Sequence, residues 1–343
     1  MIEKYSGAVF VVLLACVGIA TTLRADFSAT FSTDFEDGST QQELQSIFDE
    51  SLPHRGASLS FWNALRFRLF QETAEGAVAG NDGWIFTAEE YEYVIGADLR
   101  FAEAMASITD TAATLRAQNI HLVVSLIPDK SRIYPEFLRS NRPAPVINRY
   151  EAARALMVEN GIDAPDLLSA LLKARDTAPV FLERDTHWTP FGAQAVAQAL
   201  AGSVRSRSQN RSAFEVTPAP AIAHSGDLLK FVETGPFAKS LGLLPEIVMQ
   251  FDIYPVSGSI GLFDDPAPVE VALIGTSYSA DPLWNFASFL RFESEAELLN
   301  LSHVGMGPFF PMVEFLNADI TNENNISVVV WEIPERFLTL LEF

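Results

Sequence analysis

An acidic and a basic side chain lie two residues apart at the end of a short apolar run. Asp185 and His187 follow the apolar residues 180–182 and precede a helical pattern that begins at Pro190. A carboxylate at this spacing can accept the Nδ1–H of the histidine, fix the ring tautomer and stabilise the imidazolium form. This pair is therefore a candidate general base. Taken alone, the motif is also explained by a capping aspartate beside a surface histidine.

A candidate nucleophile follows a second apolar run. Residues 271–274 lead directly into Gly275, Thr276 and Ser277. Such a turn presents a serine at the end of a strand and leaves a following backbone N–H free to bind an oxyanion. We prefer Ser277 to Ser279, because Ser279 is expected inside the next helix, where its hydroxyl can bond to the backbone. The alternative is a plain strand end whose hydroxyl groups cap the next helix.

A third segment carries cations and an aromatic hydroxyl after a strand pattern that ends at Pro128. Cationic and hydroxyl side chains at a strand end suit an anionic or polyhydroxylated ligand, although a solvated turn explains them as well. We predict substrate contacts for four side chains, which are Lys130, Arg132, Tyr134 and Trp188.

Strand and helix patterns alternate along the chain and predict an α/β fold. Short apolar runs indicate strands at 119–127, 180–182, 271–274 and 326–333. Helical patterns cover 98–118, 149–160, 190–201 and 310–317. Continuous apolar strands separated by helices indicate a mostly parallel sheet with both faces covered. Active sites of such sheets lie at the carboxyl ends of the strands, where the three candidate segments fall. Residues 203–269 lack this pattern and are predicted to be a cap, an insertion or an irregular connection.

Composition limits the function classes. The 44 acidic and 23 basic residues give a net charge of −21, which disfavours nonspecific binding to nucleic acid or to an anionic membrane surface. The same charge means that a polyanionic substrate needs a locally basic groove. A single cysteine allows no intramolecular disulfide. The five histidines are scattered, so we predict no metal site.

The N-terminus is expected to direct the chain out of the cytoplasm. Residues 7–23 carry no charge and are flanked by Lys4 and Arg24. Seventeen apolar residues are the lower limit for a membrane-spanning helix and long for a signal peptide. We predict a signal anchor at 1–25, with cleavage left open, and an acidic Ser/Thr-rich linker at 26–45. Residues 46–343 form the predicted catalytic domain.

Together these segments resemble the SGNH-like O-acetyltransferases of the alginate J and X type, which acetylate exopolysaccharide in the periplasm. The order and separation of the two candidate catalytic segments are the specific part of the resemblance. The matching pieces span most of the chain and are the apolar N-terminus, LPHRGASLSFWNALRFRLF (52–70), GNDGWIF (80–86), PDKSRIYPE (128–136), DTHW (185–188), GTSYS (275–279) and WEIPER (331–336).

The resemblance implies a three-layer α/β/α fold and a Ser-His-Asp triad of Ser277, His187 and Asp185. Asp-His precedes the serine, a permuted order relative to ordinary SGNH esterases. Thr276 replaces the usual aspartate before the nucleophile, which leaves the oxyanion donors open. The backbone N–H of Tyr278 and the side chain of Asn285 are the candidates.

The implied activity is O-acetyl transfer to an exported polysaccharide such as alginate, through an acetyl-serine and without a cofactor. The resemblance also implies an inner-membrane anchor at 7–23, a periplasmic location and a membrane-bound O-acyltransferase as acetyl donor. Two alternatives stay open. One is a polysaccharide acetyl esterase with the same triad, and the other is a non-catalytic polysaccharide-binding subunit of an envelope complex. The sequence does not identify the polysaccharide.

Overall fold

The computed structural model describes residues 6–26, 39–52, 55–91, 93, 95–256, 269–318 and 325–340. The chain forms two compact units. The smaller consists of residues 1–71 and 232–242, and the larger of residues 72–231 and 243–343.

The smaller unit is helical in its described part. Its elements are α1 (Ser6–Arg24), α2 (Ser39–Ser51), α3 (Arg55–Phe70) and the 3₁₀ helix η6 (Gly235–Leu241). The apolar run 7–23 forms most of α1. Among the described residues, no helix has both the length and the apolar character that crossing a membrane requires. Residues 39–45, which we expected in a linker, begin α2 instead. Residues 27–38 of that expected linker lie outside the described residues.

A four-stranded parallel sheet is the centre of the larger unit. In spatial order its strands are β3 (His121–Ile127), β8 (Val328–Pro334), β6 (Val271–Ile274) and β7 (Leu298–Asn300), and every neighbouring pair is parallel. All residues of β6 and β8 are buried. Burial on both faces explains why these strands are continuously apolar rather than alternating. The predicted mostly parallel sheet is therefore confirmed.

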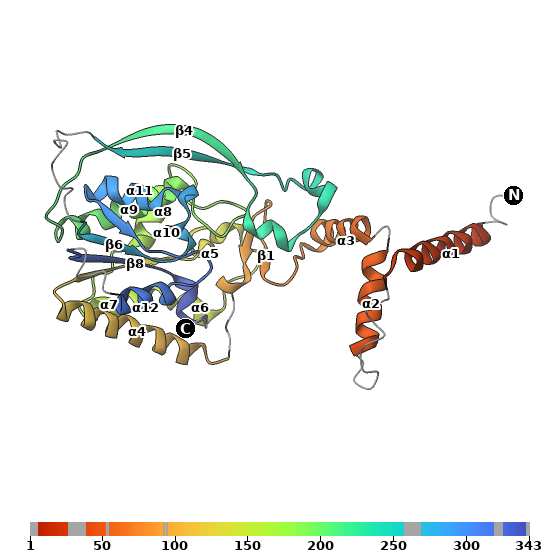
Figure 1. The fold of residues 1–343 in the computed structure, drawn as a ribbon, viewed down its shortest axis with the longest axis horizontal. Coiled ribbons are helices and arrows are strands. Elements are labelled where there is room, and N and C mark those ends of the chain that lie inside the picture. Colours follow the sequence, from red (N-terminus) through yellow and green to blue (C-terminus); the bar gives the residue numbers. More distant parts are fainter. Residues whose placement is uncertain are drawn as a thin grey trace. The chain divides into compact units, whose positions relative to one another are not determined.

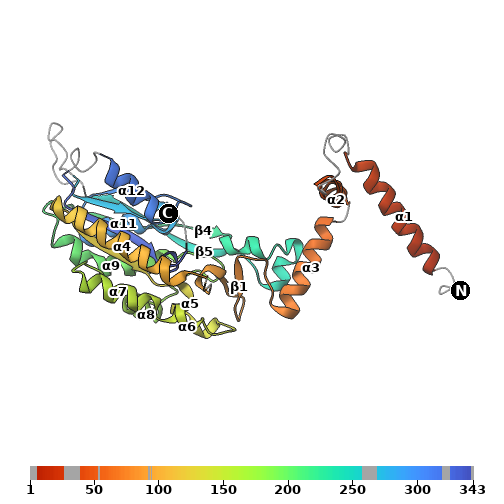
Figure 2. The ribbon, with the colours of Figure 1, turned by 90° about the horizontal axis from the view of Figure 1, so that it is seen from below.

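Helices cover both faces of this sheet, which gives the predicted three layers. One face packs against α8 (Leu167–Arg175), α9 (Pro190–Arg205) and α11 (Phe286–Ser294). The other packs against α4 (Ala97–Ala117), α7 (Arg149–Glu159) and α12 (Phe309–Asn317). In Figure 1 the first set lies above the strands and the second below them. Figure 2 looks onto the face covered by α4 and α12.

The predicted strand at 180–182 is wrong. Phe181 forms only an isolated bridge with Trp188, in a loop that folds back on itself. The loop ends where Thr189 caps α9, its side-chain oxygen accepting the N–H of Gly192 at 3.1 Å. Pro190 occupies the first turn, where no intrahelical N–H bond is lost. The loop rather than a strand end therefore sets the position of His187.

Residues 203–269 contain a long antiparallel strand pair, which the sequence patterns did not reveal. The strands are β4 (Phe214–His224) and β5 (Glu246–Pro255), and a bulge lies between Ala219 and Ile222. The pair lies over α9 and α11 in Figure 1 and contacts both helices. Residues 257–268 of the predicted cap lie outside the described residues.

Short elements complete the larger unit. The strands β1 (Ala77–Ala79) and β2 (Ile85–Thr87) form an antiparallel pair. The remaining helices are η3 (Ala88–Glu90), α5 (Lys130–Ile133), η4 (Pro135–Phe137), α6 (Ala144–Ile147), η5 (Asp227–Phe231), α10 (Ser277–Ala280), η7 (Pro282–Trp284) and η8 (Glu335–Leu338).

Candidate active site

The two candidate catalytic segments meet at the carboxyl end of the parallel sheet. Ser277 opens α10 directly after β6, and Asp185 and His187 lie in the loop before α9. The Nε2 atom of His187 lies 2.7 Å from Oγ of Ser277. On the other side of the ring, Nδ1 of His187 lies 2.7 Å from Oδ1 of Asp185. The predicted proximity of these three side chains is confirmed, and the spacing suits transfer of a proton from serine to histidine.

A buried glutamate on the neighbouring strand holds the nucleophile turn. Oε2 of Glu332 in β8 accepts the N–H of Thr276 at 2.8 Å and the hydroxyl of Ser279 at 3.0 Å. Glu332 is fully buried, and burial raises its pKa against the lowering effect of these hydrogen bonds. A Cβ at Gly275 would lie 2.5 Å from Oε2 of Glu332, so only glycine fits there. Because Ser279 is engaged with Glu332, Ser277 remains the candidate nucleophile.

The carboxylate of Asp185 is surrounded by donors. Oδ1 accepts both Nδ1–H and the backbone N–H of His187, the latter at 2.8 Å. Oδ2 accepts from Nε2 of His224 at 2.7 Å and from the N–H of Asp227 at 2.9 Å. Burial acts to raise the pKa of Asp185, but the hydrogen bond and charge of His187, together with His224, hold it well below its usual range. Asp185 is therefore an ionised acceptor at neutral pH.

Aromatic rings fix the orientation of the histidine. The His187 ring stacks on Trp284, with centroids 4.9 Å apart and planes 17° apart. The Tyr278 ring lies against the His187 ring, with centroids 4.7 Å apart. The Tyr278 hydroxyl donates to the carbonyl of Thr186 at 2.5 Å. The side chain of His187 is 14% exposed, so the ring stays accessible from solvent although these contacts fix it.

Comparisons with known proteins agree with this geometry. The family described as "SGNH hydrolase-like domain, acetyltransferase AlgX" matches residues 77–335. The chain belongs to this AlgX acetyltransferase family. The match contains every residue of the site described above, and the α/β fold with its parallel sheet is the one that the family name implies.

Curated relatives cover most of the chain. "Probable alginate O-acetylase AlgJ" of Pseudomonas syringae pv. tomato is 35% identical over 96% of this chain and 87% of the relative. The protein of the same name from Pseudomonas aeruginosa is 33% identical over the same shares. Among solved structures, the "O-Acetyltransferase Domain of Pseudomonas putida AlgJ" matches with a TM-score of 0.71 and 32% identity, over 79% of this chain and 94% of that one. These matches confirm the predicted resemblance.

The two predicted oxyanion donors of this AlgX-family site differ in their surroundings. The side chain of Asn285 is engaged with β5, since its Nδ2 donates to the carbonyl of Phe251 at 2.9 Å and its Oδ1 accepts the N–H of the same residue at 3.3 Å, so its role as an oxyanion donor stays a prediction. Asn285 therefore holds β5. The N–H of Tyr278 makes only a long bond, 3.3 Å, to Oγ1 of Thr276. The N–H of Ser277 donates to no acceptor within the described part of the chain. The backbone N–H groups of Ser277 and Tyr278 are the available donors.

The predicted substrate contact of Lys130 is wrong. Lys130 is fully buried, and its Nζ donates to four carbonyl oxygens, those of Ile85 (2.6 Å), Leu182 (3.1 Å), Glu183 (3.2 Å) and Asp185 (2.8 Å). Burial lowers its pKa to about 8, offset in part by the charges of Glu90 and Asp185. Lys130 thus supports the loop that carries Asp185 and His187 from within.

The other three predicted substrate contacts are engaged within the fold, where Tyr134 and Trp188 are buried and Arg132 is partly buried. Arg132 binds both carboxylate oxygens of Glu335, at 2.9 and 2.5 Å. The hydroxyl of Tyr134 accepts the N–H of Val180 at 2.9 Å. Trp188 has no exposed surface and packs against aromatic rings of the core. These side chains position the AlgX-family site instead of lining it, so Lys130 and Arg132 supply no basic groove for a polyanion.

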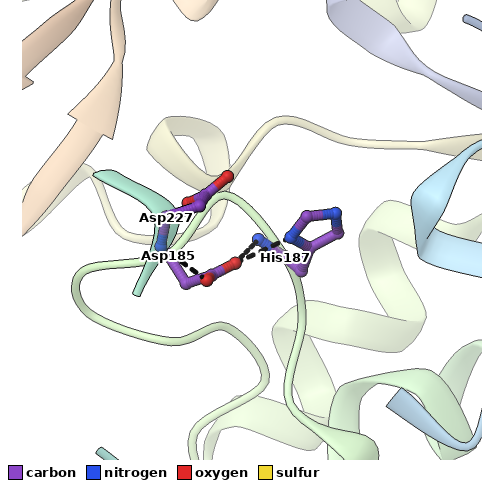
Figure 3. A group of neighbouring side chains, drawn as sticks. All are labelled: Asp185, His187 and Asp227. Carbon is purple, nitrogen blue, oxygen red and sulfur yellow. Dashed lines mark hydrogen bonds and ion pairs between the residues drawn. The ribbon is translucent and has the colours of Figure 1, made fainter. Parts of the chain in front are cut away.

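Asp185, His187 and Asp227 lie close enough to suggest a metal site (Figure 3), with ligand atoms within 4.8 Å of one another. Their hydrogen bonds favour another role. The two oxygens of Asp227 accept the N–H and the hydroxyl of Thr186, each at 2.8 Å. Both oxygens of Asp185 and both ring nitrogens of His187 are likewise engaged. These side chains are thus engaged with one another and with the loop, and the absence of a metal stays a prediction.

Proposed function

We propose that this protein transfers acetyl groups to hydroxyl groups of an exported polysaccharide such as alginate, with Ser277 as the nucleophile. The contact of 2.7 Å between Nε2 of His187 and Oγ of Ser277 carries the proposal. Relatives that are named alginate O-acetylases, and matched over most of their length, support the acceptor class.

In the first half-reaction the serine is acetylated. With Nδ1–H donated to Asp185, Nε2 of His187 accepts the proton of the Ser277 hydroxyl as Oγ attacks the acetyl carbonyl. The N–H groups of Ser277 and Tyr278 bind the oxyanion, and Asp185 stabilises the imidazolium. The tetrahedral intermediate then expels the leaving group, which takes the proton from His187, and acetyl-Ser277 remains.

The second half-reaction reverses these roles with a sugar as acceptor. His187 removes the proton of a sugar hydroxyl, whose oxygen attacks the carbonyl of acetyl-Ser277. When the intermediate collapses, Oγ of Ser277 leaves and recovers a proton from His187. The products are the acetylated sugar and the free enzyme.

The enzymatic test uses the whole protein, 4-nitrophenyl acetate as donor and short alginate oligosaccharides as acceptors. We expect mass spectrometry to detect acetylated oligosaccharide with wild type and none above the uncatalysed level with Ser277→Ala. Release of 4-nitrophenol and acetate without acetylated sugar would show hydrolysis instead of transfer and would support an esterase. Binding of the oligosaccharides with no turnover of any donor would support a non-catalytic subunit.

We further propose that the protein works in the periplasm, held at the inner membrane by residues 7–23 and supplied with acetyl groups by a membrane-bound O-acyltransferase. The uncharged sequence of residues 7–23, between Lys4 and Arg24, supports this location. A phosphatase reporter fused after Phe343 should be active only if the chain is exported. Activity from a reporter that functions only in the cytoplasm would contradict the proposed location.

A further inference from the structure

A second histidine binds the aspartate of the catalytic group. Nε2 of His224, at the end of β4, lies 2.7 Å from Oδ2 of Asp185, while His187 occupies Oδ1. Asp185 thus bridges two imidazole rings that lie 37 positions apart in the sequence, at 187 and 224. Because the ionised carboxylate can only accept hydrogen bonds, Nε2 of His224 must carry a proton.

The strand pair β4–β5 binds the loop that carries Asp185 at a second point. His224 is the cross-strand partner of Glu246 in β5. The carboxylate of Glu246 accepts the N–H groups of Glu183 and Arg184, at 2.8 and 2.9 Å. The paired ends of the two strands therefore bind three consecutive residues, 183–185, just before His187.

We propose that His224 is a positioning residue for the catalytic group, and that β4–β5 completes the active site rather than only covering the helices beneath it. This inference rests on the proposed function. The torsion that orients an aspartate carboxylate is broad, so one oxygen bound to His187 does not fix the plane of the group. Donors from His224 and from the N–H of Asp227 fix the second oxygen. Oδ1 of Asp185 is thereby kept directed at Nδ1 of His187.

The indole of Trp284 connects the two imidazoles a second time. Its face stacks on His187, and the His224 ring meets it edge to face, with centroids 5.4 Å apart and planes 89° apart. Trp284 itself is 2% exposed. A displaced His224 would therefore disturb both the acceptor of Nδ1–H and the ring against which His187 rests.

The test compares two substitutions of His224 with a matched control. His224→Phe keeps a ring against Trp284 but removes the donor, and His224→Gln keeps a donor of similar reach. The control is His121→Phe. His121 also pairs with an aspartate, Asp163, at 3.2 Å, and its side chain is 26% exposed against 23% for His224, but it begins β3 at the opposite end of the sheet.

The readouts are kcat and KM with 4-nitrophenyl acetate and the melting temperature. We expect His224→Phe to lower kcat about 10- to 100-fold, the range known for residues that orient metal-bound histidines through a hydrogen bond. KM should stay near the wild-type value, because His224 contacts Asp185 rather than the ester. His224→Gln should recover most of the lost kcat, and His121→Phe should keep wild-type kcat.

Wild-type kcat in His224→Phe, or an equal loss in His224→Phe and His224→Gln, would overturn the inference. If His224→Phe does not fold, His224→Ala assayed with and without added imidazole makes the same comparison. Recovery of kcat by imidazole is expected, and no recovery overturns the inference. If wild type itself does not form an acetyl-enzyme, the proposed function fails instead, so the two failures are distinguishable.

Discussion

The backbone N–H of Thr276 donates to the buried carboxylate of Glu332 at 2.8 Å, which ties the nucleophile turn to the adjacent strand β8. The hydroxyl groups of Thr276 and Ser279 bind the same carboxylate. The position of Ser277 therefore depends on a residue 55 positions later in the chain, at 332.

Glu332→Ala is expected to lower both stability and activity. The substitution leaves the N–H of Thr276 and two hydroxyl groups buried without an acceptor, at about 1–3 kcal/mol for each unsatisfied group. Glu332→Gln keeps an acceptor and should lose less of both. Urea unfolding and the rate of 4-nitrophenol release measure the two effects. Glu314→Ala, at an exposed site on α12, is the control. Full activity of Glu332→Ala would show that the turn needs no support.

Lys130→Met should destabilise the fold rather than weaken substrate binding. Four carbonyl oxygens lose a cationic donor, so we expect the free energy of unfolding to fall by about 1–3 kcal/mol for each carbonyl left without a donor. Activity per folded molecule should fall through kcat, because the loop of His187 loosens. A stable variant with raised KM would instead restore the sequence-based assignment of Lys130 to the substrate.

Asp185→Asn should remove a pH-dependent part of the stability. The pKa of Asp185 is held well below the ordinary aspartate value of about 3.9. A carboxyl group whose pKa is lowered on folding stabilises the fold at pH values above its unfolded-state pKa. That stabilisation is lost as the pH falls from the unfolded-state pKa through the folded-state pKa.

The difference in unfolding free energy between wild type and Asp185→Asn should therefore be large near neutral pH and should shrink below about pH 4. Urea unfolding at several pH values measures it, and the exposed Asp176→Asn is the control. A difference independent of pH from 7 to 3 would mean that Asp185 is not held ionised by its donors.

Local patterns were sufficient for three strands of the parallel sheet, β3, β6 and β8, and for the catalytic group. The strand β6 has the predicted bounds, and α7 and α9 begin where the sequence places them, because apolar runs and capping residues act within a few positions. Ser277 and His187 could be found because each lies in a short motif that follows an apolar run. By contrast, β7 has only three residues and β4 contains prolines, so neither carries a recognisable strand pattern.

Contacts between segments that lie far apart in the sequence could not be predicted from local sequence patterns. Whether Lys130 faces a ligand or the interior depends on carbonyl groups 45 to 55 positions away. His224 belongs to no motif, and only the fold brings it to Asp185. Glu332 lies in a quoted motif, WEIPER, but its role depends on the pairing of β6 with β8. A buried polar residue within an apolar strand is the signal that could have marked Glu332.

The central claim is that Ser277 carries the acetyl group between donor and acceptor. The most direct measurement is peptide mass spectrometry of the protein after rapid acid quench of its reaction with 4-nitrophenyl acetate. We predict one acetyl group on Ser277 in wild type, none in Ser277→Ala, and acetylation of Ser277 in Ser279→Ala. An acetyl group on Ser279 or elsewhere in the active protein, or an active Ser277→Ala, would contradict the claim.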